Sequence, residues 1–120
     1  MSPFFLAQDL RIVIHEVIYM DNEMMIMQLI AKGGDARSFA MKGISLARKH
    51  KIEEARAKLK EGRESVTEAH SIQTNLILKE ASGEKQEISL LLIHAQDHLM
   101  NAMTVLDMAE EFINLYEERN

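Results

Sequence analysis

Apolar residues recur at alternating intervals of three and four along the chain from Asp21 onward, which is the periodicity of amphipathic helices. The first break in this pattern is the basic cluster at residues 48–51, which is followed by Glu53 and Glu54. Cations at the end of one helix and acids in the first turn of the next suit both helix dipoles. A tight antiparallel turn is therefore expected at this point.

The second break lies around Gly83, which suits the left-handed residue that ends many helices. Glu84 and Glu87 suit the first turn of the next helix. Three long helices joined by short links predict an all-α fold, an antiparallel up-down-up three-helix bundle over residues 21–120.

Residues 1–20 are harder to assign. Apolar residues from Leu6 to Met27 recur at spacings of four and three, which is compatible with an amphipathic helix that runs into the next one. Charged residues interrupt this pattern, and the β-branched cluster at residues 12–14 lowers the helix propensity. They are treated as an N-terminal extension of unknown role.

The first predicted helix is rich in small residues. Gly33 and Gly34 are adjacent in its interior, where glycines indicate a kink, a break or a close approach of another backbone. A bent helix is the favoured interpretation, with Asp35 capping its second half. One face lets a partner helix come close, and its members are Ala36, Ala40, Gly43 and Ala47. Four methionines are expected to fill gaps in the core: Met24, Met25, Met27 and Met41.

The second predicted helix has a single packing seam with strict three-four spacing. The seam consists of Ile52, Ala55, Leu59, Gly62, Val66, Ala69, Gln73 and Leu76. Two members weaken the seam: Gly62 has no side chain to pack, and Gln73 is polar.

The third predicted helix carries two stripes. The first is a full heptad stripe that suffices for packing on the other two helices: Ile88, Leu92, Ala95, Leu99, Ala102, Leu106, Ala109, Ile113 and Tyr116. The second lies roughly 100° round the helix. Its members are Leu91, His94, His98, Asn101, Val105, Met108 and Phe112, and Leu90 and Ile93 widen it. A three-helix bundle cannot bury both stripes, so the second is expected to be buried against other copies of the chain.

Composition excludes several classes of protein. The net charge of −5 and the scattered cations argue against a nucleic-acid binder. The chain has no cysteine, which excludes disulfides and thiolate metal sites and fits a reducing cytoplasm. No apolar run approaches the roughly 20 residues of a membrane span, and no secretory signal precedes the helices.

Candidate chemistry gathers on the second stripe. His94, Asp97 and His98 lie at positions i, i+3 and i+4 of the third predicted helix and share one broad face. The sequence lacks the glutamate after His94 that a His-Glu-x-x-His zinc hydrolase needs, and no histidine follows a glutamate by three positions, as a ferritin-like di-iron site requires. It also lacks a Gly-x-Ser-x-Gly elbow and a recognisable ATP site.

A histidine beside an oligomer groove can still carry phosphate. A neutral imidazole nitrogen attacks a donor phosphorus and forms a phosphoramidate that stays reactive enough to pass on. His98, one turn beyond His94, can donate to the phosphoryl oxygens or orient the ring, and Gln96 is a candidate support residue. For Asp97 two interpretations stand: a rim aspartate in water, or one of several copies sharing an Mg²⁺ at an oligomer axis.

The segment from His94 to Met100 resembles the phosphorylation-site motif of the lactose/cellobiose (diacetylchitobiose) type of enzyme IIA in the bacterial phosphoenolpyruvate-dependent sugar phosphotransferase system. The resemblance runs from about Asp21 to Glu118. Three further blocks carry it: Gly34-Asp-Ala-Arg37-Ser38, Glu68-Ala-His70-Ser-Ile-Gln73-Thr74 and Glu80-Ala-Ser-Gly83-Glu84.

The resemblance implies a homotrimer of three-helix protomers with the third helices at the interface. It implies that His94 accepts a phosphoryl group on Nε2 from the histidine-containing phosphocarrier protein and passes it to the cognate enzyme IIB. It also implies that three copies of Asp97 hold one Mg²⁺ on the threefold axis. The chain is thus expected to be a cytoplasmic phosphotransferase-system component rather than a stand-alone sugar kinase.

Two departures from the family pattern stand out. Lys49-His50-Lys51-Ile52 occupies the place of a Gly-Asp-Phe-like turn, and residues 1–20 are additional. Ala95 leans toward the cellobiose/chitobiose branch whereas other blocks lean toward the lactose branch, so the sugar stays open. The alternative function is a non-catalytic helical oligomerisation or regulatory adaptor on the same scaffold.

Overall fold

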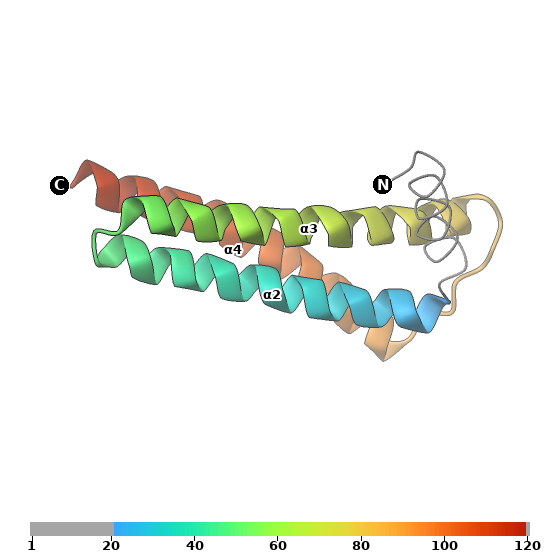
Figure 1. Ribbon diagram of the computed structural model, residues 1–120. Helices are drawn as coiled ribbons and strands as arrows, with labels where there is room; N and C mark the ends of the chain where they lie inside the picture. Colours follow the sequence, from blue (N-terminus) through green and yellow to red (C-terminus); the bar gives the residue numbers. More distant parts are fainter. Residues whose placement is uncertain (1–20, 120) are drawn as a thin grey trace, which may run out of the picture.

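The computed structural model describes residues 21–119, which form three α-helices and no strand. Helix α2 spans Asn22–Arg48, α3 spans Ile52–Ala81 and α4 spans Leu90–Glu118. The helices α2 and α3 run antiparallel beside each other, and α4 crosses them in the direction of α2 (Figure 1). The predicted all-α, up-down-up three-helix bundle is confirmed. The predicted extension, residues 1–20, lies outside the described residues.

The two ends of the bundle differ. We call the end with the short α2–α3 connection the turn end, and the end with the 82–89 connection the link end (Figure 1). At the turn end, the amide of Lys51 donates to the carbonyl of Leu46 at 2.9 Å, which confirms the tight turn. His50 has a φ of 61°, in the left-handed region that favours glycine.

At the link end, α3 terminates in a Schellman motif. The amide of Glu84 donates to the carbonyl of Lys79, and the amide of Gly83 donates to the carbonyl of Glu80, both at 3.1 Å. Gly83 has a φ of 101°, so its predicted role as the left-handed residue is confirmed.

The predicted start of the third helix was wrong. Glu84 and Glu87 lie in the non-helical link, and α4 begins only at Leu90. The side-chain oxygen of Ser89 accepts a hydrogen bond from the amide of Leu92 at 3.1 Å, so Ser89 is the N-cap that fixes the start. Ile88, a member of the predicted core stripe, precedes the helix and is 79% exposed, so its predicted place in the core is wrong.

The glycine pair does not break or kink α2, which runs through it as one helix (Figure 1). Asp35 lies inside the helix and caps nothing; the N-cap of α2 is Asp21, whose side chain accepts from the amide of Met24 at 2.8 Å. The close backbone approach, the remaining alternative, is found at Gly33 and is described below.

The core is built largely from alanine. The predicted small-residue face of α2 is buried throughout, and the seams of α3 and α4 follow the predicted spacing. The fully buried alanines are Ala36, Ala40, Ala47, Ala55, Ala69, Ala95, Ala102 and Ala109. Larger fully buried side chains, Leu29, Leu99, Leu106 and Ile113 with Met25, fill the space between them. Of the four methionines expected in the core only Met25 is buried, because Met24, Met27 and Met41 lie on outer faces of α2.

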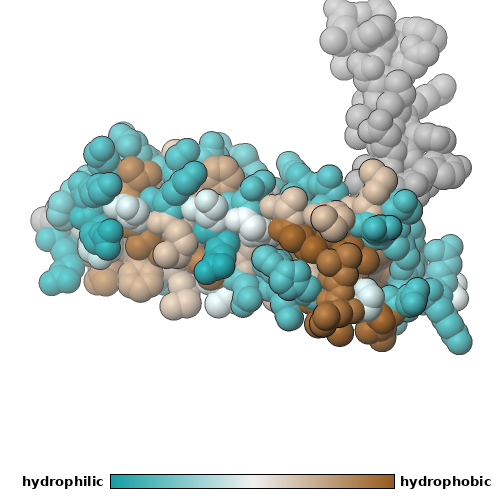
Figure 2. All heavy atoms as spheres, turned by 90° about the horizontal axis from the view of Figure 1, so that it is seen from below, coloured by the Kyte–Doolittle hydropathy of each residue, from teal (hydrophilic) through white to brown (hydrophobic). Residues whose placement is uncertain are grey.

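The second stripe of α4 is open in the single protomer. Of its apolar members, Leu91, Met108 and Phe112 are exposed and Val105 is half-buried, and Leu90 and Ile93 beside the stripe are also exposed. Figure 2 shows hydrophobic side chains gathered toward one end of the molecule, and the exposed apolar residues of the link end include Ile88, Leu90, Leu91 and Ile93. In the described part of the chain, none of the helices is apolar enough over a sufficient length to cross a bilayer.

Candidate functional site

His94 and His98 lie one turn apart on the outer face of α4, as their spacing predicts. Their Nε2 atoms are 3.0 Å apart, so one ring donates a hydrogen bond to the other. The ring centroids are 4.3 Å apart and the ring planes meet at 83°. His94 is exposed whereas His98 is half-buried. The pair therefore presents one imidazole to solvent with a second ring held against it.

The backbone behind the pair is anchored on two sides. Ala95 and Leu99 are fully buried on the inner face of α4. On the side of α2, Gly33 lies against the main chain of His98: a Cβ at Gly33 would meet the carbonyl carbon and oxygen of His98 at 3.2 Å. Only glycine lets α2 and α4 approach so closely at this level without displacement. The histidines are thus carried on a segment whose position is fixed by packing.

An open hollow of about 510 Å³ lies beside the histidine pair. It brings together three of the predicted site residues, and its lining consists of Arg37, His94, Asp97, His98, Asn101 and Val105. The five α4 residues share one helix face. Arg37 comes from α2, and its place here depends on how the two helices pack, so spacing along the chain could not reveal it. Arg37 and the two imidazoles supply donors to this hollow that suit an anion, whereas the carboxylate of Asp97 opposes one.

Gln96 lies on a different side of α4. Its side-chain carbonyl accepts a hydrogen bond from the side-chain amide of Gln73 in α3. Residues two apart in a helix do not face each other, so Gln96 cannot share the face of His94 and His98. The structure brings Gln96 to the α3–α4 contact and not to the histidines. Gln73, noted only as a polar member that weakens the seam, is thereby explained as its partner.

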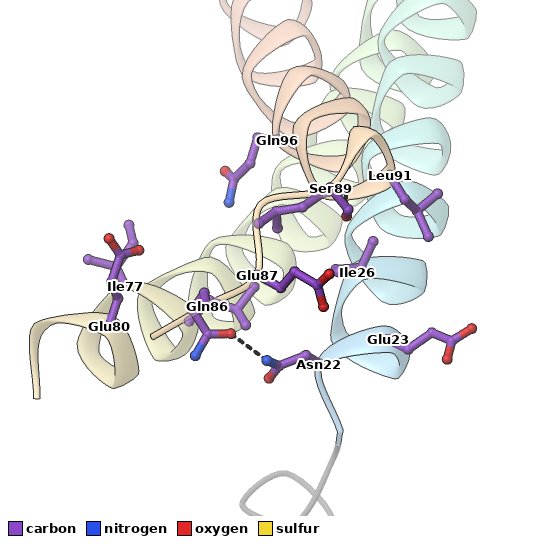
Figure 3. Close-up of a pocket in the computed structure, with 12 residues that line it drawn as sticks. Asn22, Glu23, Ile26, Ile77, Glu80, Gln86, Glu87, Ser89, Leu91 and Gln96 are labelled. Carbon is purple, nitrogen blue, oxygen red and sulfur yellow. Dashed lines mark hydrogen bonds between the residues drawn. The ribbon is translucent and has the colours of Figure 1, made fainter. Parts of the chain in front are cut away.

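A second hollow, of about 350 Å³, opens at the link end where α3 and α4 diverge (Figure 3). The side-chain amide of Asn22 donates to the side-chain carbonyl of Gln86 there, which fastens the link to the start of α2. Glu23, Glu80 and Glu87 are among its lining residues. Three carboxylates disfavour a phosphoryl group in this hollow. Sequence reasoning missed it because it arises from the divergence of two helices.

Asp97 is exposed at the edge of the histidine hollow. Within residues 21–119 of one chain, no group of three or more His, Cys, Asp or Glu side chains could hold a metal ion. An aspartate oxygen is a ligand that Mg²⁺ accepts, but one carboxylate is a single ligand. The donor set of this chain therefore fits Mg²⁺ only where several copies contribute Asp97.

The comparisons with known proteins agree on one family. Residues 24–117 match the family described as "PTS system, Lactose/Cellobiose specific IIA subunit". The lichenan-specific phosphotransferase enzyme IIA component of Bacillus subtilis is 55% identical over 96 residues, which is 80% of this chain and 87% of that protein. The galactose-specific EIIA component of Lactococcus lactis subsp. cremoris is 43% identical over 88 residues, covering 73% of this chain and 76% of that one.

Solved structures give the same result. The cellobiose-specific enzyme IIA of Bacillus anthracis superimposes with a TM-score of 0.79 at 50% identity, covering 84% of this chain and 94% of that one. The IIA(Chitobiose)–HPr complex of the N,N'-diacetylchitobiose branch of the Escherichia coli phosphotransferase system matches with a TM-score of 0.72 at 37% identity, covering 82% and 95%.

Proposed function

This chain belongs to the lactose/cellobiose-specific IIA family of the phosphotransferase system, and from that membership we propose that His94 carries a phosphoryl group between two partner proteins. The observation that carries the proposal is the exposed His94, paired with His98 beside an open hollow, inside the segment that matches the family. As a IIA component the protein is a phosphoryl-transfer intermediate and not a stand-alone sugar kinase.

The proposed donor is the histidine-containing phosphocarrier protein, HPr, and the proposed acceptor is the cognate enzyme IIB. A complex of a similar IIA with HPr supports the choice of donor. Transfer to IIB is the step that couples the chain to sugar uptake and phosphorylation, and the proposed place of action is the cytoplasm.

In the accepting step, the lone pair of His94 Nε2 attacks the phosphorus of the donor's phosphohistidine. The donor's N–P bond breaks as the new N–P bond forms, and the donor ring leaves with the electron pair. His94 releases its Nδ1 proton to solvent and the leaving ring takes one up, so charge is balanced. The reverse sequence at His94 delivers the group to IIB.

His98 supports this step through its Nε2–H. The two Nε2 atoms are 3.0 Å apart, so in the tautomer in which His98 donates, its N–H holds the lone pair of His94 and must release it before the attack on phosphorus. As the N–P bond forms, the same N–H is free to donate to a phosphoryl oxygen. Gln96 supports the site indirectly, through its hydrogen bond to Gln73, which ties α4 to α3.

The exposed stripe of α4 supports assembly as a homotrimer with the α4 helices at the interface. A lone protomer leaves Leu91, Met108 and Phe112 in water, and burial against other copies removes that apolar area. In such a trimer, three copies of Asp97 near the axis would hold one structural Mg²⁺. The chemistry this ion supplies is neutralisation of like charges.

The class of sugar is inferred from the relatives. Identity is 55% to the lichenan-specific IIA of Bacillus subtilis and 50% to the cellobiose-specific IIA of Bacillus anthracis, whereas the galactose-specific and cellobiose-specific EIIA components of Lactococcus lactis are 43% and 42% identical, so the proposal rests on the two Bacillus relatives. We therefore propose a branch that takes up β-glucan oligosaccharides of the cellobiose type. Transfer of label from the phosphorylated protein to IIB proteins of the cellobiose and galactose branches tests this.

The experiment that tests the carrier function is labelling with phosphoenolpyruvate, enzyme I and HPr. The wild-type chain should gain one acid-labile phosphoryl group. His94→Ala should gain none, and His98→Ala should label more slowly. His70→Ala is the matched control, because His70 is an exposed histidine on α3 away from the hollow. Full labelling of His94→Ala refutes the site, and an unlabelled wild-type chain favours the adaptor alternative.

A further inference from the structure

Once His94 is phosphorylated, the histidine hollow carries an excess of negative charge. A phosphoryl group brings between one and two negative charges near neutral pH, and Asp97 lies in the same hollow. The imidazoles of His94 and His98 are neutral when they act as nucleophile and neutral donor. Among the described residues that line the hollow, the only remaining charged side chain is Arg37.

The packing of α2 on α4 places Arg37 near the level of His94 and His98 along the bundle axis. Gly33 touches the main chain of His98, and Arg37 lies one turn further along the same face of α2. Side chains on a helix lean toward its N-terminus, so Arg37 leans back toward the level of Gly33 and His98. Because α2 and α4 run in the same direction, this is also the direction of His94 (Figure 1).

Within residues 21–119, the guanidinium of Arg37 also has no carboxylate partner. Among residues 21–119, Arg56 is paired with Glu117, and Arg63 is paired with both Asp107 and Glu110. Arg37, like Arg48 at the end of α2, makes no such ion pair with a described residue, and of these two only Arg37 lines the hollow. A planar cation with five donors that is exposed, makes no ion pair within residues 21–119 and lines the same hollow as the acceptor histidine fits two oxygens of one phosphoryl group.

We propose that Arg37 binds the phosphoryl oxygens of phosphorylated His94. The proposal rests on the proposed carrier function and adds a second helix to the reacting site. Arg37 and the Nε2–H of His98 together satisfy the oxygens of the group, from α2 and α4 respectively. The contact forms as negative charge arrives at the hollow, so it favours the transition state as well as the product.

The test compares Arg37→Gln and Arg37→Lys with the control Arg48→Gln, an exposed arginine in the last turn of the same helix. Initial rates of labelling from phosphorylated HPr are measured first. Arg37→Gln should be slower by about ten- to hundred-fold, the range for loss of one hydrogen bond to a charged group. Arg37→Lys should recover part of the rate, and the control should match wild type.

The second measurement reports on the phosphoryl group alone, because it is made on the phosphorylated protein in the absence of the donor. The ³¹P resonance of each phosphorylated protein is titrated with pH. A guanidinium beside the group favours its dianion, so the midpoint should move to higher pH in Arg37→Gln and return toward wild type in Arg37→Lys.

The outcomes separate the hypotheses. A wild-type rate, or a slowed rate with an unchanged ³¹P midpoint, overturns the proposal, since in the second case Arg37 acts on donor docking and not on the phosphoryl group. A wild-type chain that takes no label refutes the carrier function itself. A slowed rate with a raised midpoint supports the role of Arg37.

Discussion

The adjacent glycines of α2 allow a paired test of how the histidine segment is held. A Cβ at Gly33 would meet the carbonyl carbon and oxygen of His98 at 3.2 Å and its Cβ at 3.3 Å, whereas a Cβ at Gly34 would meet nothing within 4 Å. Both changes to alanine remove the intrinsic penalty of glycine in a helix, about 1 kcal/mol. Only Gly33→Ala pushes α4 away from α2.

The change in the free energy of unfolding for each variant depends on whether the gain in helix propensity exceeds the cost of overpacking. The contacts at Gly33 are with main-chain atoms of a packed helix, which cannot swing aside as the tip of a side chain can. Overpacking of this kind costs about 1–3 kcal/mol, so Gly33→Ala should lose about 1 kcal/mol net. Gly34→Ala should gain about 0.5–1 kcal/mol. For a domain of this size the two variants should differ in Tm by roughly 10 °C.

The assay is thermal and urea unfolding followed by far-UV circular dichroism at one fixed protein concentration, because assembly would make the midpoint depend on concentration. Labelling rates should follow the same order, since Gly33→Ala displaces the backbone of His98. If Gly33→Ala stabilises the protein as much as Gly34→Ala does, the close approach of α2 and α4 does not hold the site in place.

Three further changes probe other parts of the molecule. His50→Gly should stabilise the protein against urea by up to about 1 kcal/mol because His50 has a φ of 61°, and a loss of stability would contradict this. Leu99→Ala removes a fully buried side chain behind the histidines and should lower the free energy of unfolding by about 2–5 kcal/mol in the same urea assay. Phe112→Lys places a charge on the exposed stripe of α4 and should reduce the mass found by sedimentation to that of one chain, while Met41→Lys, at a similarly exposed site on α2, should not; an unchanged mass for Phe112→Lys would remove the stripe from the interface.

Local signals in the sequence predicted the features that depend on one helix. The spacing of His94 and His98 put the two rings side by side, and Gly83 identified the end of α3. The start of α4 was misplaced because acids suit any first turn, whereas Ser89 before an apolar run was the more specific signal. The position of Gln96 could also have been read from helix geometry, since residues two apart face different sides.

Features that depend on two helices could not be predicted in this way. The partner of Gly33 and the presence of Arg37 beside His94 follow from the register in which α2 lies against α4. Many registers satisfy the same pattern of small residues, and a shift of one turn would bring different side chains to the hollow. The prediction that Met24, Met27 and Met41 fill gaps in the core was wrong because it also depended on the spacing between helices: alanines fill the narrow space between them.

The alanine-rich interior has a consequence for how such a carrier works. Eight fully buried alanines hold the three axes close together and leave little side-chain length that could rearrange. A rod of this construction has few alternative packings, so transport of the group is expected to come from exchange of the proteins that dock on it. The phosphoryl group would then move from donor to acceptor by diffusion of the partner proteins, while the imidazole that accepts it stays in a fixed position.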